Sequence, residues 1–129
     1  MASASDKAWN DYLSGNRLER GEDCPPDRET AALFYRRAAF RGLPEAQHAL
    51  AFMCATGQGV ARDEAQAVRW FQAAAEQGHT SAQHNLGVMY AEGRGIERDE
   101  QAAVRWFYEA ALGGSADARS WLDGQAETG

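Results

Sequence analysis

The sequence has no long run of apolar residues. No stretch approaches the ~20 consecutive apolar residues that a helix needs to cross a bilayer, and residues 1–5 are small and polar, unlike a secretory signal. We therefore expect a cytoplasmic protein without a membrane-spanning segment. A chain from which a signal peptide had been removed would read the same.

Positive charge is also scarce. Lys7 is the single lysine among 13 basic residues, which face 19 acidic ones, so the formal net charge is −6. Nucleic acids and anionic membranes attract proteins through a basic surface. This charge balance argues against both and favours a neutral or basic protein partner.

Cysteine is nearly absent. Cys24 and Cys54 are too few for a disulfide framework, and we expect both to be reduced thiols. The sequence contains neither paired metal-binding cysteines nor an HExxH motif. We accordingly predict no metal site and no cofactor.

What the chain does contain is an internal repeat of 36 residues. Residues 46–81 and 82–117 are identical at 19 of 36 positions, and residues 10–45 form a degenerate third copy that keeps Gly21, Asp27 and Gly42 in register. Such periods are typical of solenoids built from paired helices. We predict an all-α solenoid of three antiparallel helix pairs, closed by a capping helix over residues 118–124. One domain would span residues 6–124, between a flexible start (1–5) and a tail (125–129).

Helix starts are predicted where a side chain can accept hydrogen bonds from first-turn amides. The predicted caps are Asp6, Asp27, Asp63, Ser81 and Asp99. The Gly-x-Gly segments at 57–59 and 93–95 fall in loops, where glycine allows positive φ. They lack the strand and the third glycine of a phosphate-binding loop.

The second helix of each repeat carries aromatic residues among alanines. In the third copy, Ala103, Trp106, Phe107 and Ala110 have the spacing of one buried helix face. Alanines bracketing a large ring allow two helices to approach while the ring fills the gap. We predict that Trp106 and its equivalent Trp70 are core residues rather than ligand-stacking surfaces.

The full pattern, A-x-x-x-L-G-x-M-Y-x-x-G-x-G-[VI]-x-x-D-x-x-x-A-x-x-W-[FY]-x-x-A-A-x-x-G, resembles the Sel-one-like repeat (SLR), a relative of the tetratricopeptide repeat. Residues 82–114 match it nearly throughout, and residues 46–78 match closely, with Ala51 and Cys54 in place of the expected Gly and Tyr. Residues 10–42 match poorly. The resemblance implies an α-solenoid whose first helices line a concave groove, in proteins that mostly serve as non-catalytic adaptors and scaffolds. A cysteine-rich branch linked to β-lactams has paired cysteines that this chain lacks.

We expect the groove to be lined by first-helix residues that face away from the apolar stripe. Aromatic rings beside histidines and a few acids suit a protein or peptide surface. The predicted partner-binding residues are Trp9, Tyr12, Asn16, Glu45, His48, Phe52, Ser81, His84, Val88, Glu92, Asp117 and Ser120. Among them Tyr12, His48, His84 and Ser120 would form one row. The alternative for Tyr12 and Phe52 is packing against a neighbouring repeat.

Two chemical alternatives lack the residues that they need. His48 and His84 occupy equivalent positions, yet a stable metal site requires further ligands at fixed geometry. His79 and Ser81 form a Ser/His neighbour pair at a turn, without an orienting group. We therefore predict no catalytic residues.

These observations predict a non-catalytic module that binds a protein partner on its concave face. By analogy, it would be a bacterial immunity-type or regulatory protein that neutralises one dedicated partner. The alternative is a general adaptor or scaffold in bacterial signalling, secretion or envelope biogenesis. A small hydrolase is an alternative of another class, which the residue inventory does not support.

Overall fold

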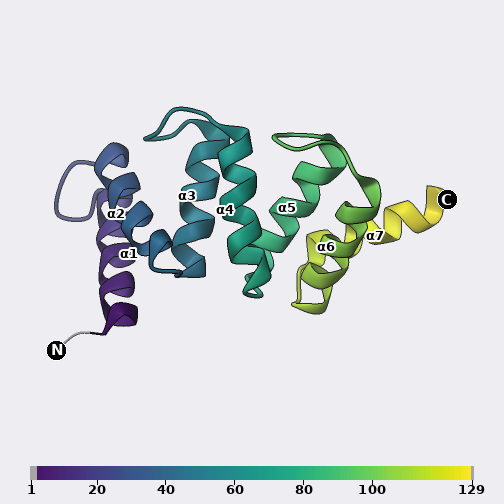
Figure 1. Ribbon diagram of the computed structural model, residues 1–129, viewed down its shortest axis with the longest axis horizontal. Helices are drawn as coiled ribbons and strands as arrows, with labels where there is room; N and C mark the ends of the chain where they lie inside the picture. Colours follow the sequence, from purple (N-terminus) through teal and green to yellow (C-terminus); the bar gives the residue numbers. More distant parts are fainter. Residues whose placement is uncertain (1–2, 129) are drawn as a thin grey trace.

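The computed structural model describes residues 3–128, with side chains through residue 126. This part of the chain forms seven helices and no strand. The helices are α1 (Ala4–Arg20), α2 (Arg28–Phe40), α3 (Pro44–Thr56), α4 (Glu64–Glu76), α5 (Thr80–Glu92), α6 (Glu100–Leu112) and α7 (Ala116–Thr128). They follow one another along the length of the molecule, with the two ends of the chain at opposite ends (Figure 1).

Each helix packs on its neighbours in the sequence. The contacts are most extensive within the pairs α1–α2, α3–α4 and α5–α6, and smaller between successive pairs. Helix α7 packs on α6, where the Trp121 ring stacks on Phe107 with 4.2 Å between centroids. The predicted solenoid of three helix pairs and a capping helix is confirmed.

The core of each repeat is filled by one aromatic ring from its second helix. These rings belong to Tyr35, Phe71 and Phe107, which are at most 2% exposed. Two of these rings lie over a glycine of the first helix: an ideal Cβ on Gly15 would sit 2.6 Å from the Tyr35 ring, and one on Gly87 would sit 3.0 Å from the Phe107 ring. Close packing therefore limits that first-helix position to a small residue.

The tryptophans do not occupy that place. Trp70 and Trp106 are only partly buried, at the border of the core. The prediction that the tryptophans fill the core is therefore wrong. The residue that follows each of them, Phe71 or Phe107, lies about 100° further around the helix and points between the helices.

Three of the predicted caps are confirmed. Asp27, Asp63 and Asp99 each accept a hydrogen bond of 3.0 Å from the backbone amide three residues later. Asp63 and Gln66 do not form a reciprocal capping box, since the Gln66 side chain accepts a hydrogen bond from the Cys54 thiol instead (3.2 Å).

The other two predicted caps are wrong. Helix α1 begins at Ala4, because Ser3 caps it and Asp6 completes the capping box from the third helical position. Helix α5 begins at Thr80, because the chain enters the helix directly after the left-handed Gly78, and His79 caps it through Nδ1. Ser81 is the second residue of that helix.

Helix α7 continues to Thr128, four residues past Gly124, where the sequence predicted its end. Gly124 does not adopt a positive φ. A glycine inside a helix costs about 1 kcal/mol relative to alanine but does not by itself end it, and no proline follows.

The loops between paired helices dock each repeat on the one before it. Gly59 and Gly95 have φ near 74° and 72° and lie against the first turn of the preceding second helix. An ideal Cβ would sit 2.4 Å from the Arg28 carbonyl oxygen at Gly59 and 2.3 Å from the Glu64 carbonyl oxygen at Gly95. Arg94 adds an ion pair to Glu64 (3.0 Å), and this pair lowers the pKa of the Glu64 carboxyl.

Candidate functional site

The helices α1, α3, α5 and α7 form one face of the solenoid, which we call the first-helix face. A hollow of about 650 Å³ lies on it, lined by residues of α3, α5, α7 and the loop before α7. Five of the predicted partner-binding residues line this first-helix hollow: His48, Phe52, Ser81, His84 and Asp117. The rest of its lining is Thr80, Asn85, Gly113, Gly114, Ser115 and Ala116.

Three residues of the predicted row, Tyr12, His48 and His84, also pack against the core. Each ring contacts the buried aromatic ring of its own repeat, with centroids 5.8, 5.7 and 5.5 Å apart, respectively. Tyr12 thus packs within its own repeat rather than against a neighbouring one. Phe52 is 48% exposed and is available to a partner.

His48 is the most constrained residue of the hollow. Its ring stacks on His79 with centroids 4.7 Å apart, and its Nε2 accepts a hydrogen bond from the Asn85 side-chain amide (3.0 Å). Burial and the neighbouring His79 lower the pKa of His48 to about 4. Burial also lowers the pKa of His79, an effect that Glu45 opposes. His48 is therefore neutral at pH 7 and acts as an acceptor.

The remaining predicted residues lie outside the hollow. The buried Tyr35 hydroxyl lies 2.7 Å from Asn16 Oδ1 and 2.7 Å from Glu19 Oε1 and donates its one proton to either of them, so the Asn16 side chain is directed toward the core. Trp9 is 40% exposed and meets Tyr12 edge to face. The positions of the others are as follows: Glu45 is half-buried, Val88 packs on the C-terminal part of the core, Glu92 pairs with Arg94, and Ser120 is exposed on α7.

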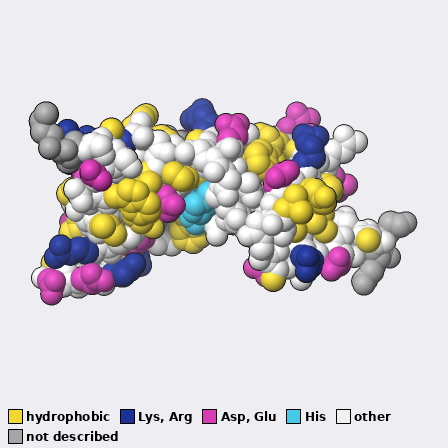
Figure 2. All heavy atoms as spheres, turned by 90° about the horizontal axis from the view of Figure 1, so that it is seen from below, with side chains coloured by type: hydrophobic (Ala, Val, Ile, Leu, Met, Phe, Trp, Pro, Cys, Tyr) yellow, Lys and Arg dark blue, Asp and Glu magenta, His cyan; other side chains and the backbone are white. Residues whose placement is uncertain are grey.

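Figure 2 shows histidine surface near the middle of one face, beside acidic and hydrophobic side chains. Within residues 3–128, no group of three or more His, Cys, Asp or Glu side chains is placed to hold a metal ion. The same part of the chain has no helix long and apolar enough to span a bilayer.

The family model for the Sel1 repeat matches residues 12–42, 44–79 and 80–115. The chain belongs to the Sel1 repeat family. Sel1 repeats generally serve as protein-interaction modules, and proteins built from them generally lack catalysis.

Two solved Sel1-type structures are similar to this Sel1 repeat chain in sequence as well as in fold. One is c5321, a protective antigen of uropathogenic Escherichia coli strains with an SLR fold: 40% identity, a TM-score of 0.88, and coverage of 89% of this chain and 25% of that one. The other is a Sel1 repeat protein from Oxalobacter formigenes: 30% identity, a TM-score of 0.84, and coverage of 86% of this chain and 46% of that one.

More distant or shorter matches are consistent with this family. Cysteine rich protein B of Helicobacter pylori shares the fold with a TM-score of 0.70 at 17% identity, over 92% of this chain and 97% of that one. The uncharacterized protein NMB1327 of Neisseria meningitidis serogroup B is 52% identical over 42 residues, 33% of this chain and 9% of that protein. This Sel1 repeat chain spans less than half of the length of NMB1327, c5321 and the Oxalobacter protein.

Sequence reasoning missed His79 and Asn85 as parts of the site. His79 occupies the place of Leu43 and Ser115, which directly precede the helices α3 and α7. This equivalent position could have predicted that His79 caps α5. Its stacking on His48 could not be predicted in the same way, because it depends on how α3 and α5 pack. Since Nδ1 of His79 accepts the Ala82 amide (3.1 Å), it is occupied as a helix cap rather than paired with Ser81.

The buried, neutral His48 makes the stability of the Sel1 solenoid depend on pH. The folded pKa of about 4 lies below the unfolded value of 6.5, so below pH 6.5 the unfolded chain binds a proton that the folded chain does not. We expect the free energy of unfolding to fall by about 2 to 3 kcal/mol between pH 6.5 and 4 on account of His48.

Urea unfolding of wild type and His48→Gln at several pH values measures this effect. The carboxylates titrate in both proteins, so the change with pH in the stability difference between them reports on His48. A stability difference that stays constant from pH 7 to pH 4 would contradict the prediction.

Proposed function

We propose that this chain is a non-catalytic recognition module that binds one dedicated protein partner on a concave first-helix face. The observation that carries the proposal is the hollow in which His48, Phe52, Ser81, His84 and Asp117 come together from three helices. A surface assembled from successive repeats is how solenoids present extended binding sites.

The lining of the hollow supports a protein partner of neutral or basic character. It contains Asp117 and no lysine or arginine, and the chain as a whole carries a net charge of −6. Phe52 and, further along the face, Trp9 expose aromatic surface of the kind that contributes most to binding energy at protein interfaces. The neutral His48 and the Asn85 amide add polar groups that are already oriented by a hydrogen bond.

Within this function we favour a bacterial immunity-type or regulatory protein acting in the cytoplasm and neutralising its partner. On the first-helix face, the three repeats and α7 present one described hollow, which supports a single client at that face. The alternative is an adaptor or scaffold in signalling, secretion or envelope biogenesis, which the greater length of the similar E. coli and Oxalobacter proteins favours.

Substitutions on the rim of the hollow test the binding surface. Phe52→Glu combined with Ser81→Arg changes two exposed side chains: a carboxylate replaces the apolar ring of Phe52, and a bulky guanidinium replaces the small hydroxyl of Ser81. We expect affinity for the protein captured by the wild-type chain to fall at least about tenfold, since an aromatic ring that a partner buries contributes about 2 kcal/mol or more at interfaces. Pull-down with mass spectrometry identifies the partner, and titration calorimetry measures affinity and stoichiometry.

The control is Tyr108→Glu, which makes the same aromatic-to-glutamate change as Phe52→Glu at an exposed residue of α6. Unchanged affinity in the rim variant, or equal losses in rim variant and control, would refute binding at the hollow. A tight one-to-one complex supports the dedicated partner, whereas many weak partners support the adaptor alternative.

A further inference from the structure

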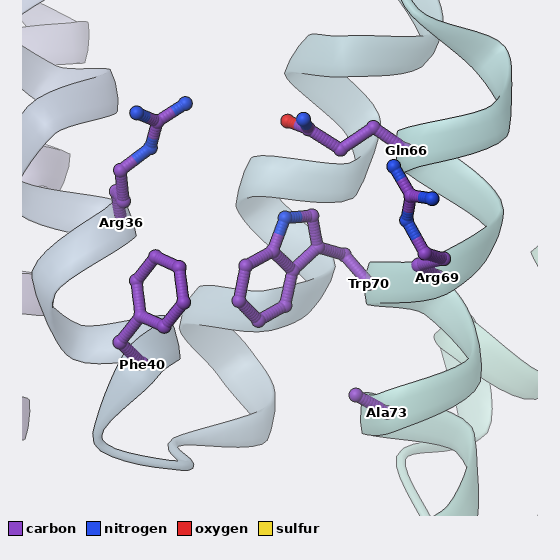
Figure 3. A pocket seen from close by; sticks show the side chains of 6 residues that line it. All are labelled: Arg36, Phe40, Gln66, Arg69, Trp70 and Ala73. Carbon is purple, nitrogen blue, oxygen red and sulfur yellow. The ribbon is translucent and has the colours of Figure 1, made fainter.

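A second hollow lies on the other set of helices. It has a volume of about 450 Å³ and is formed between α2 and α4. We call it the α2–α4 pocket; its lining residues are Arg36, Phe40, Gln66, Arg69, Trp70 and Ala73 (Figure 3). It shares no residue with the first-helix hollow.

Two aromatic rings form the apolar part of this pocket. Phe40 meets Trp70 edge to face, with centroids 5.1 Å apart, and Phe40 is 73% exposed. In Figure 3 the two rings lie side by side, with the Arg36 guanidinium and the Gln66 carboxamide both above them. Large rings left uncovered beside polar groups are characteristic of interaction sites.

The charge at the pocket is opposite to that of the protein as a whole. Arg17, Arg20, Arg37, Arg62, Arg94 and Arg98 form ion pairs with acidic side chains. Arg36 and Arg69 form none with any acidic side chain in the described part of the chain, although the net charge is −6; the same is true of Arg28, Arg41, Arg105 and Arg119, none of which lines this pocket. Two uncompensated guanidinium groups therefore flank the exposed rings, and guanidinium groups bind carboxylates well.

The repeat itself does not require this combination of residues. One repeat later, Arg105 and Trp106 are equivalent to Arg69 and Trp70, but Glu76 stands at the position of Phe40 and Glu109 at that of Ala73. Both glutamates are exposed on the same kind of helix pair. An acidic side chain is thus compatible with the fold at the position of Phe40, so the exposed ring of Phe40 is not needed to build the repeat.

From these observations we propose that the α2–α4 pocket binds a peptide segment of a second protein, in which a large apolar side chain is flanked by carboxylates. The apolar side chain contacts the Phe40 and Trp70 rings, the carboxylates pair with Arg36 and Arg69, and the Gln66 amide hydrogen-bonds to the peptide. An anionic bilayer fits less well, because the net charge of the chain opposes its approach to such a surface. The pocket would let the chain hold two proteins at once, on separate faces.

An acetylated and amidated peptide, Asp-Asp-Phe-Asp-Gly, is a direct probe. Its twin with asparagine at every aspartate keeps the apolar side chain and removes the charge. NMR titration resolves the indole N–H signals of the four tryptophans, and Trp70→Phe assigns that of Trp70. We expect the acidic peptide to shift the Trp70 signal and the backbone signals of α2 and α4, and the twin to bind about tenfold more weakly.

Two variants test the residues in different ways. Arg36→Gln with Arg69→Gln removes the charge, and Phe40→Glu recreates the side chain found one repeat later, so neither is expected to disturb the fold. Each should weaken the peptide about tenfold or more. Arg105→Gln, at the equivalent of Arg69, is the matched control and should leave affinity unchanged.

Several outcomes would overturn the proposal. These are equal binding of the asparagine twin, full affinity in the double arginine variant, or shifts confined to the first-helix face. If the protein failed to bind the peptide but sedimented together with phosphatidylserine vesicles, the pocket would be a membrane-binding surface instead. A dimer that dissociates on Phe40→Glu, without peptide binding, would identify a second copy of the chain. The variant Phe52→Glu with Ser81→Arg leaves the α2–α4 pocket intact. The proposal for the first-helix hollow and the proposal for this pocket can therefore be refuted independently.

Discussion

Replacing Gly95 with alanine is expected to destabilise the solenoid by about 4 kcal/mol. The residue has a φ of 72°, and an ideal Cβ would sit 2.3 Å from the carbonyl oxygen and 2.5 Å from the carbonyl carbon of Glu64. Those are backbone atoms in the first turn of α4, where hydrogen bonds restrict their movement. The third repeat would have to separate from the second to make room. Urea unfolding followed by circular dichroism measures the loss.

Gly78→Ala is the matched control for this substitution. Gly78 also has a positive φ, 90°, but no atom lies within 4 Å of an ideal Cβ. Only the backbone strain remains, and we expect a loss of about 1 to 2 kcal/mol. Similar losses at both positions would show that conformation alone, rather than contact between repeats, accounts for the glycine at 95.

Replacing Phe107 with alanine is expected to cost about 3 to 5 kcal/mol. The ring is 1% exposed, lies against Gly87 and His84, and carries the stacked Trp121 of α7. Its removal leaves a cavity between the last helix pair and the capping helix. We therefore expect α7 to lose its main apolar anchor and to show faster amide exchange than in the wild type.

Comparing Trp106→Ala with Phe107→Ala tests which of the two neighbouring rings fills the core. Trp106 is larger than Phe107 but only partly buried, so the loss should be about 1 to 2 kcal/mol, in proportion to the smaller area removed from water. A loss at Trp106 equal to or greater than that at Phe107 would contradict the assignment of Phe107 as the core ring. Urea unfolding of both variants measures the difference.

The sequence by itself determined the features that depend on residues close together in the chain. The period of 36 residues, the helix pairs and the caps at Asp27, Asp63 and Asp99 are of this kind, because a cap joins atoms three residues apart. Part of the candidate site could be predicted for the same reason. Helix periodicity and the repeat place five residues of the hollow on the same face: His48, Phe52, Ser81, His84 and Asp117.

Tertiary structure decided what lies between repeats. Whether Trp106 or Phe107 fills the core depends on the angle at which helices meet, and the stacking of His79 on His48 depends on how α3 and α5 approach each other. Gly95 shows how far prediction from the sequence extends. Its sequence pattern indicates a turn, but its closest contact is with Glu64, in the preceding repeat. Such distances are set by the packing of whole helices, which residues a few positions apart in the chain do not determine.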